Sequence, residues 1–178
     1  QQVVKDLERR LGAAPAPERR ELWVKLARIH LEAGEPERAA SAWQEVLALS
    51  PEDPEALRGL VASLEAQGER RAADLAPALA RLSALGGPDR ADLELRRAAL
   101  LVAPLDRPAE AAAAYLALLR AGGLGPAQVA QVAAALERLP GRGVATVRIA
   151  QALAPLYAAA GDPAKHVAML ELLARTSP

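Results

Sequence analysis

Residues 21–51 read ELWVKLARIHLEAGEPERAASAWQEVLALSP, and this stretch decides the fold. The apolar positions of its first half recur at spacings typical of one helix face: Trp23, Leu26, Ala27 and His30. Those of its second half do the same: Ala39, Trp43, Val46 and Leu47. Between the halves, Gly34 can adopt the positive φ that ends a helix, and Pro36 suits the first turn of the next. The stretch therefore predicts two helices joined by a tight turn.

The same pattern returns further along the chain. Residues 20–53 superimpose on residues 54–87 with an offset of 34 residues. Matching pairs include Trp23 with Leu57, Leu26 with Leu60, Gly34 with Gly68, and Ala39 with Ala73. We therefore predict two successive helix-turn-helix units, with Asp53 as the N-cap that opens the second.

The first unit closely resembles the tetratricopeptide repeat (TPR) family. Eight positions of the family pattern are filled in fixed register: Trp23, Leu26, Ala27, Gly34, Ala39, Trp43, Val46 and Pro51. The resemblance implies an all-α fold of about ten helices, in which helix-turn-helix repeats stack as a right-handed α-solenoid. The Ala-, Leu- and Arg-rich composition is similar to that of large TPR proteins of GC-rich bacteria. We therefore interpret the chain as a fragment of a longer bacterial array.

The second unit departs from the pattern because Pro77 occupies the place of Trp43. A proline deep in a helix costs about 3 kcal/mol. We expect the second helix of this unit to start late, with Asp74 as N-cap and Pro77 in the first turn. A kinked helix that starts at Arg70 is the alternative.

The remaining segments predict further, less regular repeats. Val3–Leu11 fits the second helix of an earlier unit whose first helix is missing. Residues 89–121 form a degenerate third unit, with helices 89–103 and 108–121. We therefore assign residues 1–121 to TPR-like repeats. After the glycine-rich linker 122–126, residues 126–178 continue the array as degenerate repeats.

Within residues 126–178, we predict helices 126–139, 144–160 and 163–175, with a break at Pro140–Gly143 and a kink at Pro155. The turn Gly161-Asp162-Pro163 copies Gly34-Glu35-Pro36.

Composition narrows the function classes. Lys+Arg and Asp+Glu are 22 each, so the basic excess of a nucleic-acid-binding domain is missing. The longest apolar stretch, Ala98–Leu105, is far too short for a membrane span. We expect a soluble protein, and the sequence leaves the compartment open between cytoplasm and periplasm.

No residue pattern in the chain predicts catalysis. The two histidines, His30 and His166, belong to no metal-ligand motif, and cysteine is absent. No serine lies in a nucleophile elbow, and the glycine-rich linker lacks the Lys-Ser/Thr end of a phosphate loop. We predict no enzyme activity, cofactor or metal, and interpret His30 as a residue of the packing face.

The resemblance to TPR proteins implies a partner segment bound along the concave face of the first helices of each repeat. Transferred to this chain, the positions are Glu21, Val24, Arg28, Leu31 and Glu32, then Glu55, Arg58, Ala62, Glu65 and Ala66. The clamp that grips chaperone tails is not predicted, because its early positions hold Val24, Arg28, Gly59 and Ala62.

Three functions follow from this interpretation. The leading one is a scaffold that binds a protein or peptide partner, acidic or amphipathic, through this face. The second is a structural spacer or self-assembly module that associates through open array ends. The third is an accessory domain of an enzyme whose catalytic part lies outside these residues.

Overall fold

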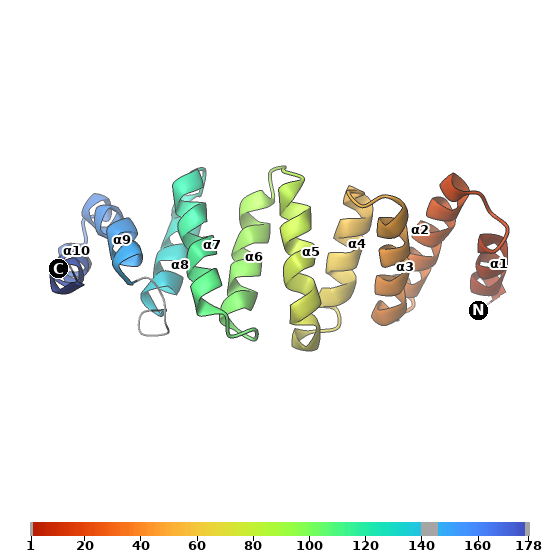
Figure 1. The fold of residues 1–178 in the computed structure, drawn as a ribbon, viewed down its shortest axis with the longest axis horizontal. Helices are drawn as coiled ribbons and strands as arrows, with labels where there is room; N and C mark the ends of the chain where they lie inside the picture. The colour runs from red at the N-terminus through yellow and green to blue at the C-terminus, as the bar shows by residue number, and fades with distance from the viewer. Residues whose placement is uncertain (1, 140–145, 177–178) are drawn as a thin grey trace. The chain divides into compact units, whose positions relative to one another are not determined.

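The computed structural model describes residues 2–139 and 146–176, and this part of the chain consists of helices and loops without a strand (Figure 1). The all-α prediction with about ten helices is confirmed. The α-helices are α1 (Gln2–Leu11), α2 (Ala16–Glu32), α3 (Pro36–Leu49), α4 (Pro54–Glu65), α5 (Ala72–Ala84), α6 (Arg90–Val102), α7 (Pro108–Ala121), α8 (Pro126–Glu137), α9 (Thr146–Ala160) and α10 (Pro163–Thr176). One short 3₁₀ segment, η1 (Glu69–Arg71), precedes α5.

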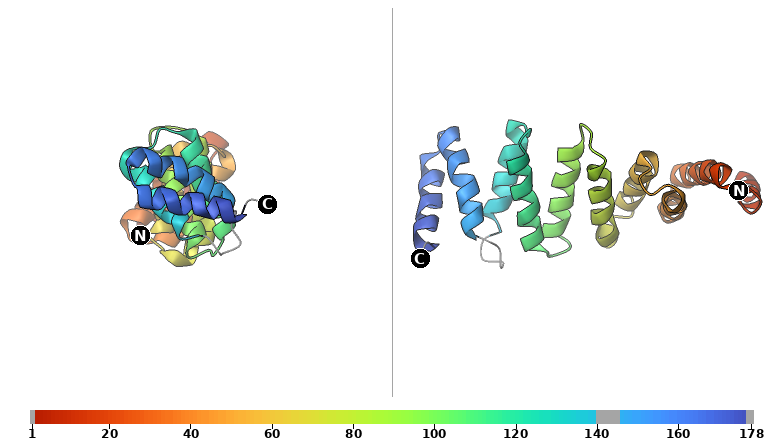
Figure 2. Two further views of the ribbon diagram at one scale, coloured as in Figure 1. Left: turned by 90° about the vertical axis from the view of Figure 1, so that its left-hand side faces the viewer. Right: turned by 45° about the horizontal axis from the view of Figure 1, so that its top comes forward.

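The helices belong to two compact units, residues 1–93 and residues 94–178, and the boundary between them falls within α6. In the first unit each helix packs against the next, from α1 to α5. In the second unit α7 contacts both α8 and α9, and α9 forms an extensive pair with α10, visible as neighbouring helices in Figure 2. The division of the array into repeats 1–121 and 126–178 stays a prediction.

The turn between α2 and α3 has the hydrogen bonds that the glycine predicts. Gly34 adopts a φ of 71°, and the Glu35 amide donates to the His30 carbonyl at 2.8 Å. The Gly34 amide donates to Leu31, so the last carbonyls of α2 are satisfied as in a Schellman motif. Gly161, with a φ of 69°, ends α9 in the same way before Pro163 opens α10. The predicted copy of the first turn is therefore confirmed.

The expected late start of the helix that contains Pro77 is wrong. α5 begins at Ala72, so Pro77 is its sixth residue and lies beyond the first turn. Asp74 does not act as N-cap; it lies in the first turn and pairs with Arg71 at 2.9 Å. The helix tolerates the proline because both Pro77 and Ala73, whose carbonyl lacks its i+4 donor, are exposed to water.

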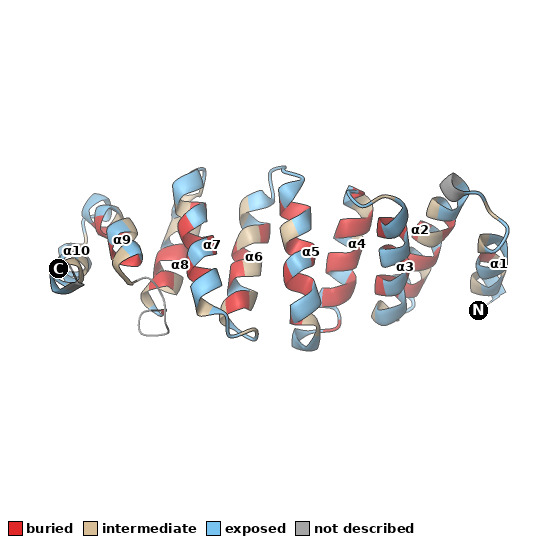
Figure 3. Cartoon of the chain, in the orientation of Figure 1, coloured by how far each residue is buried: buried red, intermediate tan, exposed pale blue. Residues whose placement is uncertain are grey.

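The core of the first unit follows the predicted helix faces. Ala27 and Ala39 are fully buried, so α2 and α3 can approach closely. Trp43 is buried as predicted, whereas Trp23 is only half-buried. In Figure 3, helices α3 to α5 carry their buried residues on the sides that face neighbouring helices.

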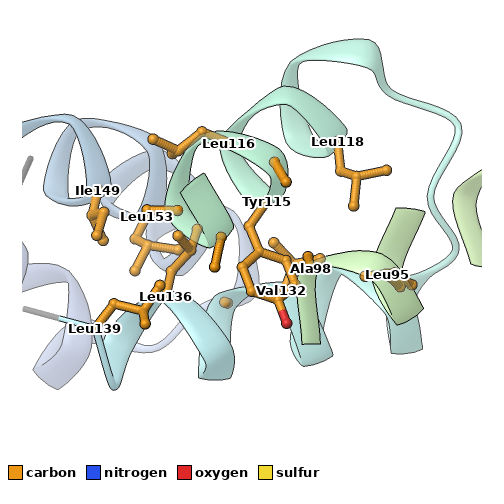
Figure 4. Packing of buried hydrophobic residues seen from close by; sticks show 14 of the residues in the cluster. Leu95, Ala98, Tyr115, Leu116, Leu118, Val132, Leu136, Leu139, Ile149 and Leu153 are labelled. Atoms are coloured by element: carbon orange, nitrogen blue, oxygen red, sulfur yellow. The ribbon is translucent and has the colours of Figure 1, made fainter. Parts of the chain in front are cut away.

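The core of the second unit gathers around Tyr115 of α7. Figure 4 shows its ring between Ala98 of α6 and Val132 of α8. Other buried members of this cluster include Leu95, Leu116, Leu118, Leu136, Leu139, Ile149, Leu153 and Tyr157. The predicted break at Pro140–Gly143 and the predicted helix start at Val144 lie outside the described residues.

Candidate protein-interaction surface

The residues predicted to bind a partner lie on α2 and α4, and most of them are open to solvent. The exposed ones are Glu21, Arg28, Leu31, Glu32, Arg58, Ala62 and Glu65, and Glu55 is half-buried. We call these eight residues the α2–α4 face. Val24 is the exception. Only 7% of it is exposed, so its placement on a binding surface is corrected to the packed interior.

Two arginines of α2 join this face to the start of α4. The Arg20 Nε donates to Asp53 Oδ2 at 2.9 Å, and Arg28 Nη2 lies 2.5 Å from Glu55 Oε1. A third contact, Arg20 to Glu55 at 3.7 Å, links the two pairs. The α2 and α4 helices are therefore held side by side by charge as well as by apolar packing.

Asp53 has two roles in this network. Its Oδ1 accepts from the amides of Glu55 and Ala56, both at 3.0 Å, and so caps α4 as predicted. Burial acts to raise the pKa of Asp53, but the Ala56 amide and the Arg20 guanidinium outweigh burial and lower this pKa below its ordinary value. The sequence predicted the cap but not the partner, because Arg20 lies 33 residues earlier.

The charges of the α2–α4 face are unequal, and one of its two arginines is already paired. Arg28 is already paired with Glu55, whereas Arg58 forms no ion pair within the described residues. The face carries four glutamates and two arginines, so it is acidic by two charges and is not lined mainly by arginine. Arg58 is the cation of the face that is left available to an incoming carboxylate.

A second surface feature lies on α1, α2 and α3, and sequence analysis missed it. It is an open cleft of about 810 Å³ whose floor is formed by α2, including Trp23, Leu26 and Ile29. We call it the α1–α3 cleft. Residues of α1 form one of its walls and residues of α3 the other. Trp23 lies on the helix face that the sequence predicts to pack, and it is only half-buried because it lines this cleft.

One end of the α1–α3 cleft holds a polar cluster. His30 is buried, as expected for the packing face, and its Nδ1 lies 2.7 Å from Glu35 Oε2. The same carboxylate oxygen accepts from Arg38 at 3.2 Å. The hydrogen bond with His30, supported by Arg38, lowers the pKa of Glu35.

The second unit has its own polar cluster, at Glu137. The Tyr157 hydroxyl donates to Glu137 Oε1 at 2.5 Å, and Lys165 Nζ lies 3.2 Å from the same oxygen. The Lys165 ammonium also lies 5.0 Å from the centre of the Tyr157 ring. Burial, and then the neighbouring Glu137 carboxylate, raise the pKa of Tyr157. This cluster ties α8, α9 and α10 together.

Neither a metal site nor a membrane-spanning helix is found in residues 2–139 and 146–176. No group of three or more His, Cys, Asp or Glu side chains there is arranged to hold a metal ion. No helix in that part of the chain has both the length and the apolar character needed to cross a membrane.

The helices and their tight turns define an all-helical protein built from helix-turn-helix units, and the α2–α4 face lies on two of its helices. Residues 20–63 match the family model of the tetratricopeptide repeat, so the resemblance seen in the sequence is confirmed over that segment. No curated protein matches the chain.

The solved structures that are similar to the chain include the following two. One is the crystal structure of MamA, with 17% identity, a TM-score of 0.44, and coverage of 97% of this chain and 85% of that one. The other is the flexible tandem repeat domain from a subunit of bacterial cellulose synthase. Its identity is 20%, its TM-score is 0.35, and the match covers 92% of this chain and 86% of that one.

Proposed function

We propose that the chain is a protein-interaction scaffold that binds a segment of a partner protein on the α2–α4 face. The observation that carries this proposal is the match of residues 20–63 to the tetratricopeptide repeat. In this segment α2 and α4 display exposed charged and small side chains. Packing and ion pairs already fix α2 against α4, so a partner meets a preformed surface and little affinity is lost to ordering it.

The composition of the face indicates the chemistry of the partner. Leu31 and Ala62 offer exposed apolar area, and Arg58 and Glu32 are charged groups without an ion pair in the described part of the chain. An amphipathic helix can place apolar side chains on the first pair and opposite charges on the second. Of the two predicted partner types, acidic or amphipathic, we therefore propose an amphipathic segment that has both acidic and basic residues. We propose no catalytic role for the residues of the α2–α4 face.

The test is retention of a partner on the immobilised chain, compared with the Arg58→Glu variant. Arg58 is exposed and unpaired in the described residues, so its reversal changes the charge of the face without breaking an internal ion pair. The matched control is Arg138→Glu, the same charge change at an exposed arginine of the second unit. A partner lost by Arg58→Glu and kept by Arg138→Glu supports the proposal, provided that circular dichroism shows equal helix content.

Equal retention by both variants would contradict the assignment of the α2–α4 face. The Arg28→Glu variant is a weaker test, because it also leaves Glu55 without its partner. A loss of binding there would combine a surface effect with a change in how α2 meets α4.

A further inference from the structure

The floor of the α1–α3 cleft is apolar and open to solvent. It runs along α2 from Trp23 to Ala33, which is about 15 Å of helix, and Ala42 of α3 adds to the apolar lining. Trp23 and Ile29 are both only half-buried there. Burying such surface is favourable in proportion to the apolar area removed from water. An occupant of the cleft therefore needs an apolar side.

The unpaired polar atoms that line the cleft are mainly hydrogen-bond acceptors. Glu8 on the α1 wall and Glu45 on the α3 wall are exposed, and neither forms an ion pair with any described residue. Glu35 uses its Oε2 for both His30 and Arg38, so its Oε1 has no partner in the described residues. Carboxylate oxygens on both walls of the cleft are therefore left to accept hydrogen bonds from an occupant.

Positive charge is scarcer in the lining of the cleft. Arg38 is engaged by Glu35, which leaves Lys5 as the one Lys or Arg of the lining without an ion pair in the described residues. Lys5 lies on the α1 wall, one helical turn from Glu8, whereas Glu45 stands on the opposite wall. Because unpaired carboxylates outnumber unpaired cations, a complementary occupant brings positive charge and hydrogen-bond donors to the walls.

Trp23 narrows the chemistry of the cation. Indole is the aromatic ring that attracts cations best, and a guanidinium stacks on such rings while it forms forked hydrogen bonds with carboxylates. We propose that the α1–α3 cleft binds an amphipathic helical segment of a partner protein. Apolar side chains of this segment cover the α2 floor, and its arginines reach Glu8 and Glu45 on the two walls. The cleft shares no residue with the α2–α4 face, so it is a second, separate binding surface.

The test uses a synthetic helical peptide of about three turns, with leucines on one stripe and an arginine on each side of it. Calorimetric titration of the native chain measures its affinity. In a Trp43→Phe background Trp23 is the remaining tryptophan, and its quenching by acrylamide should decrease as the peptide covers the floor. A matched peptide with citrulline in place of arginine keeps the shape, loses the charge, and should bind at least about tenfold more weakly. Equal affinity of the two peptides, or no binding of either, would overturn the inference.

Charge variants of the cleft walls test where the arginines bind. Glu8→Gln with Glu45→Gln should weaken binding of the arginine peptide at least about tenfold and leave that of the citrulline peptide unchanged. Lys5→Gln should bind the arginine peptide at least as tightly as the native chain, because it removes a like charge from the α1 wall. The matched control is Glu21→Gln with Glu32→Gln, the same charge change at two exposed carboxylates of the α2–α4 face, which should not alter the affinity.

Two outcomes with these variants would contradict binding in the cleft. Equal weakening by both double variants would show that the peptide responds to the net charge of the chain or binds on the α2–α4 face. An equal loss of affinity for the arginine and citrulline peptides in Glu8→Gln with Glu45→Gln would show that the two carboxylates do not contact the arginines. Neither result bears on the proposed α2–α4 function, which is tested separately by partner retention on Arg58→Glu.

Discussion

The indole ring of Trp43 lies directly against Gly59 of the next helix. A Cβ atom added at Gly59 would come within 2.2 Å of Trp43 Cε2, a distance that real Cβ contacts do not show. Trp43 is 3% exposed, and its Nε1 has no hydrogen-bond partner in the described residues. The ring therefore packs directly against the Gly59 backbone, and the missing side chain of Gly59 makes that packing possible.

The Gly59→Ala variant should be destabilised. Alanine favours a helix over glycine by about 1 kcal/mol, so any loss measures the collision with Trp43. We expect a net loss of about 1–3 kcal/mol, as in other overpacked cores. Urea unfolding measures it. Gly12→Ala is the control, since the added Cβ there meets only an ordinary contact at 3.6 Å, and the Gly59→Ala/Trp43→Phe double variant should recover part of the loss. An unchanged urea midpoint for Gly59→Ala would refute the close contact.

The two tryptophans should differ in their contribution to stability. The repeat pattern predicts a cost of about 3–5 kcal/mol for truncating either one to alanine, if both are buried. Trp43 meets that condition, and Trp23 does not, because it faces the α1–α3 cleft. We expect Trp43→Ala to lie in that range and Trp23→Ala to cost about half as much. Equal losses in chemical unfolding would contradict the open cleft.

Removing the charge of Asp53 should weaken the fold at neutral pH. Asn is also a good N-cap, so Asp53→Asn keeps the bonds to α4 and loses the ion pair with Arg20, whereas Asp53→Ala loses both. We expect Asp53→Ala to cost about 1 kcal/mol more than Asp53→Asn. Urea midpoints of the three proteins give the comparison.

The same residue predicts a pH dependence. The folded pKa of Asp53 is lowered below the unfolded value of about 3.9, so its stabilisation is complete above that value and is lost as the pH falls through the folded pKa. The unfolding free energy of the native chain should therefore drop more steeply below about pH 4 than that of Asp53→Asn. If the unfolding free energies of the native chain and Asp53→Asn fell in parallel below about pH 4, the Asp53 carboxylate would gain no stabilisation from Arg20.

Pro77→Ala should stabilise the first unit. Pro77 lies inside α5 and is exposed, so alanine restores a backbone hydrogen bond without removing buried surface. We expect a gain of about 1–3 kcal/mol in unfolding free energy. Pro163→Ala serves as the control, because a proline in the first position of a helix costs nothing there. A loss of stability in Pro77→Ala would show that the η1–α5 junction depends on the proline ring.

Tyr157→Phe should weaken the second unit through Glu137. Loss of this hydrogen bond should lower the free energy of unfolding at neutral pH by about 1 kcal/mol. Tyr115→Phe is the control, because the Tyr115 hydroxyl has no hydrogen-bond partner in the described residues. The folded pKa of Tyr157 is raised, so its contribution is present below the unfolded value of about 10 and is lost as the pH rises above it. The native chain and Tyr157→Phe should therefore converge in stability at alkaline pH. A constant difference would contradict this linkage.

Local signals in the sequence were enough to predict most helix boundaries. The turn at Gly34, the cap at Asp53 and the start of α7 at Pro108 are each set by a residue's own backbone preferences or by neighbours a few positions away. The 34-residue offset added the pairing of α2 with α3 and of α4 with α5, because a repeated pattern of buried positions implies repeated packing.

Tertiary structure decided which residues the predicted buried helix faces contact. The burial of Val24 and the half-exposure of Trp23 depend on neighbouring helices, not on the residues around each in sequence. Arg20 and Asp53 are 33 residues apart, and Gly59 matters only because Trp43 reaches it from α3. Periodicity tells which side of a helix is buried. The distance and angle between helices, set by how whole side chains interlock, determine which charges pair, which glycine has no room for a methyl group, and where a cleft stays open.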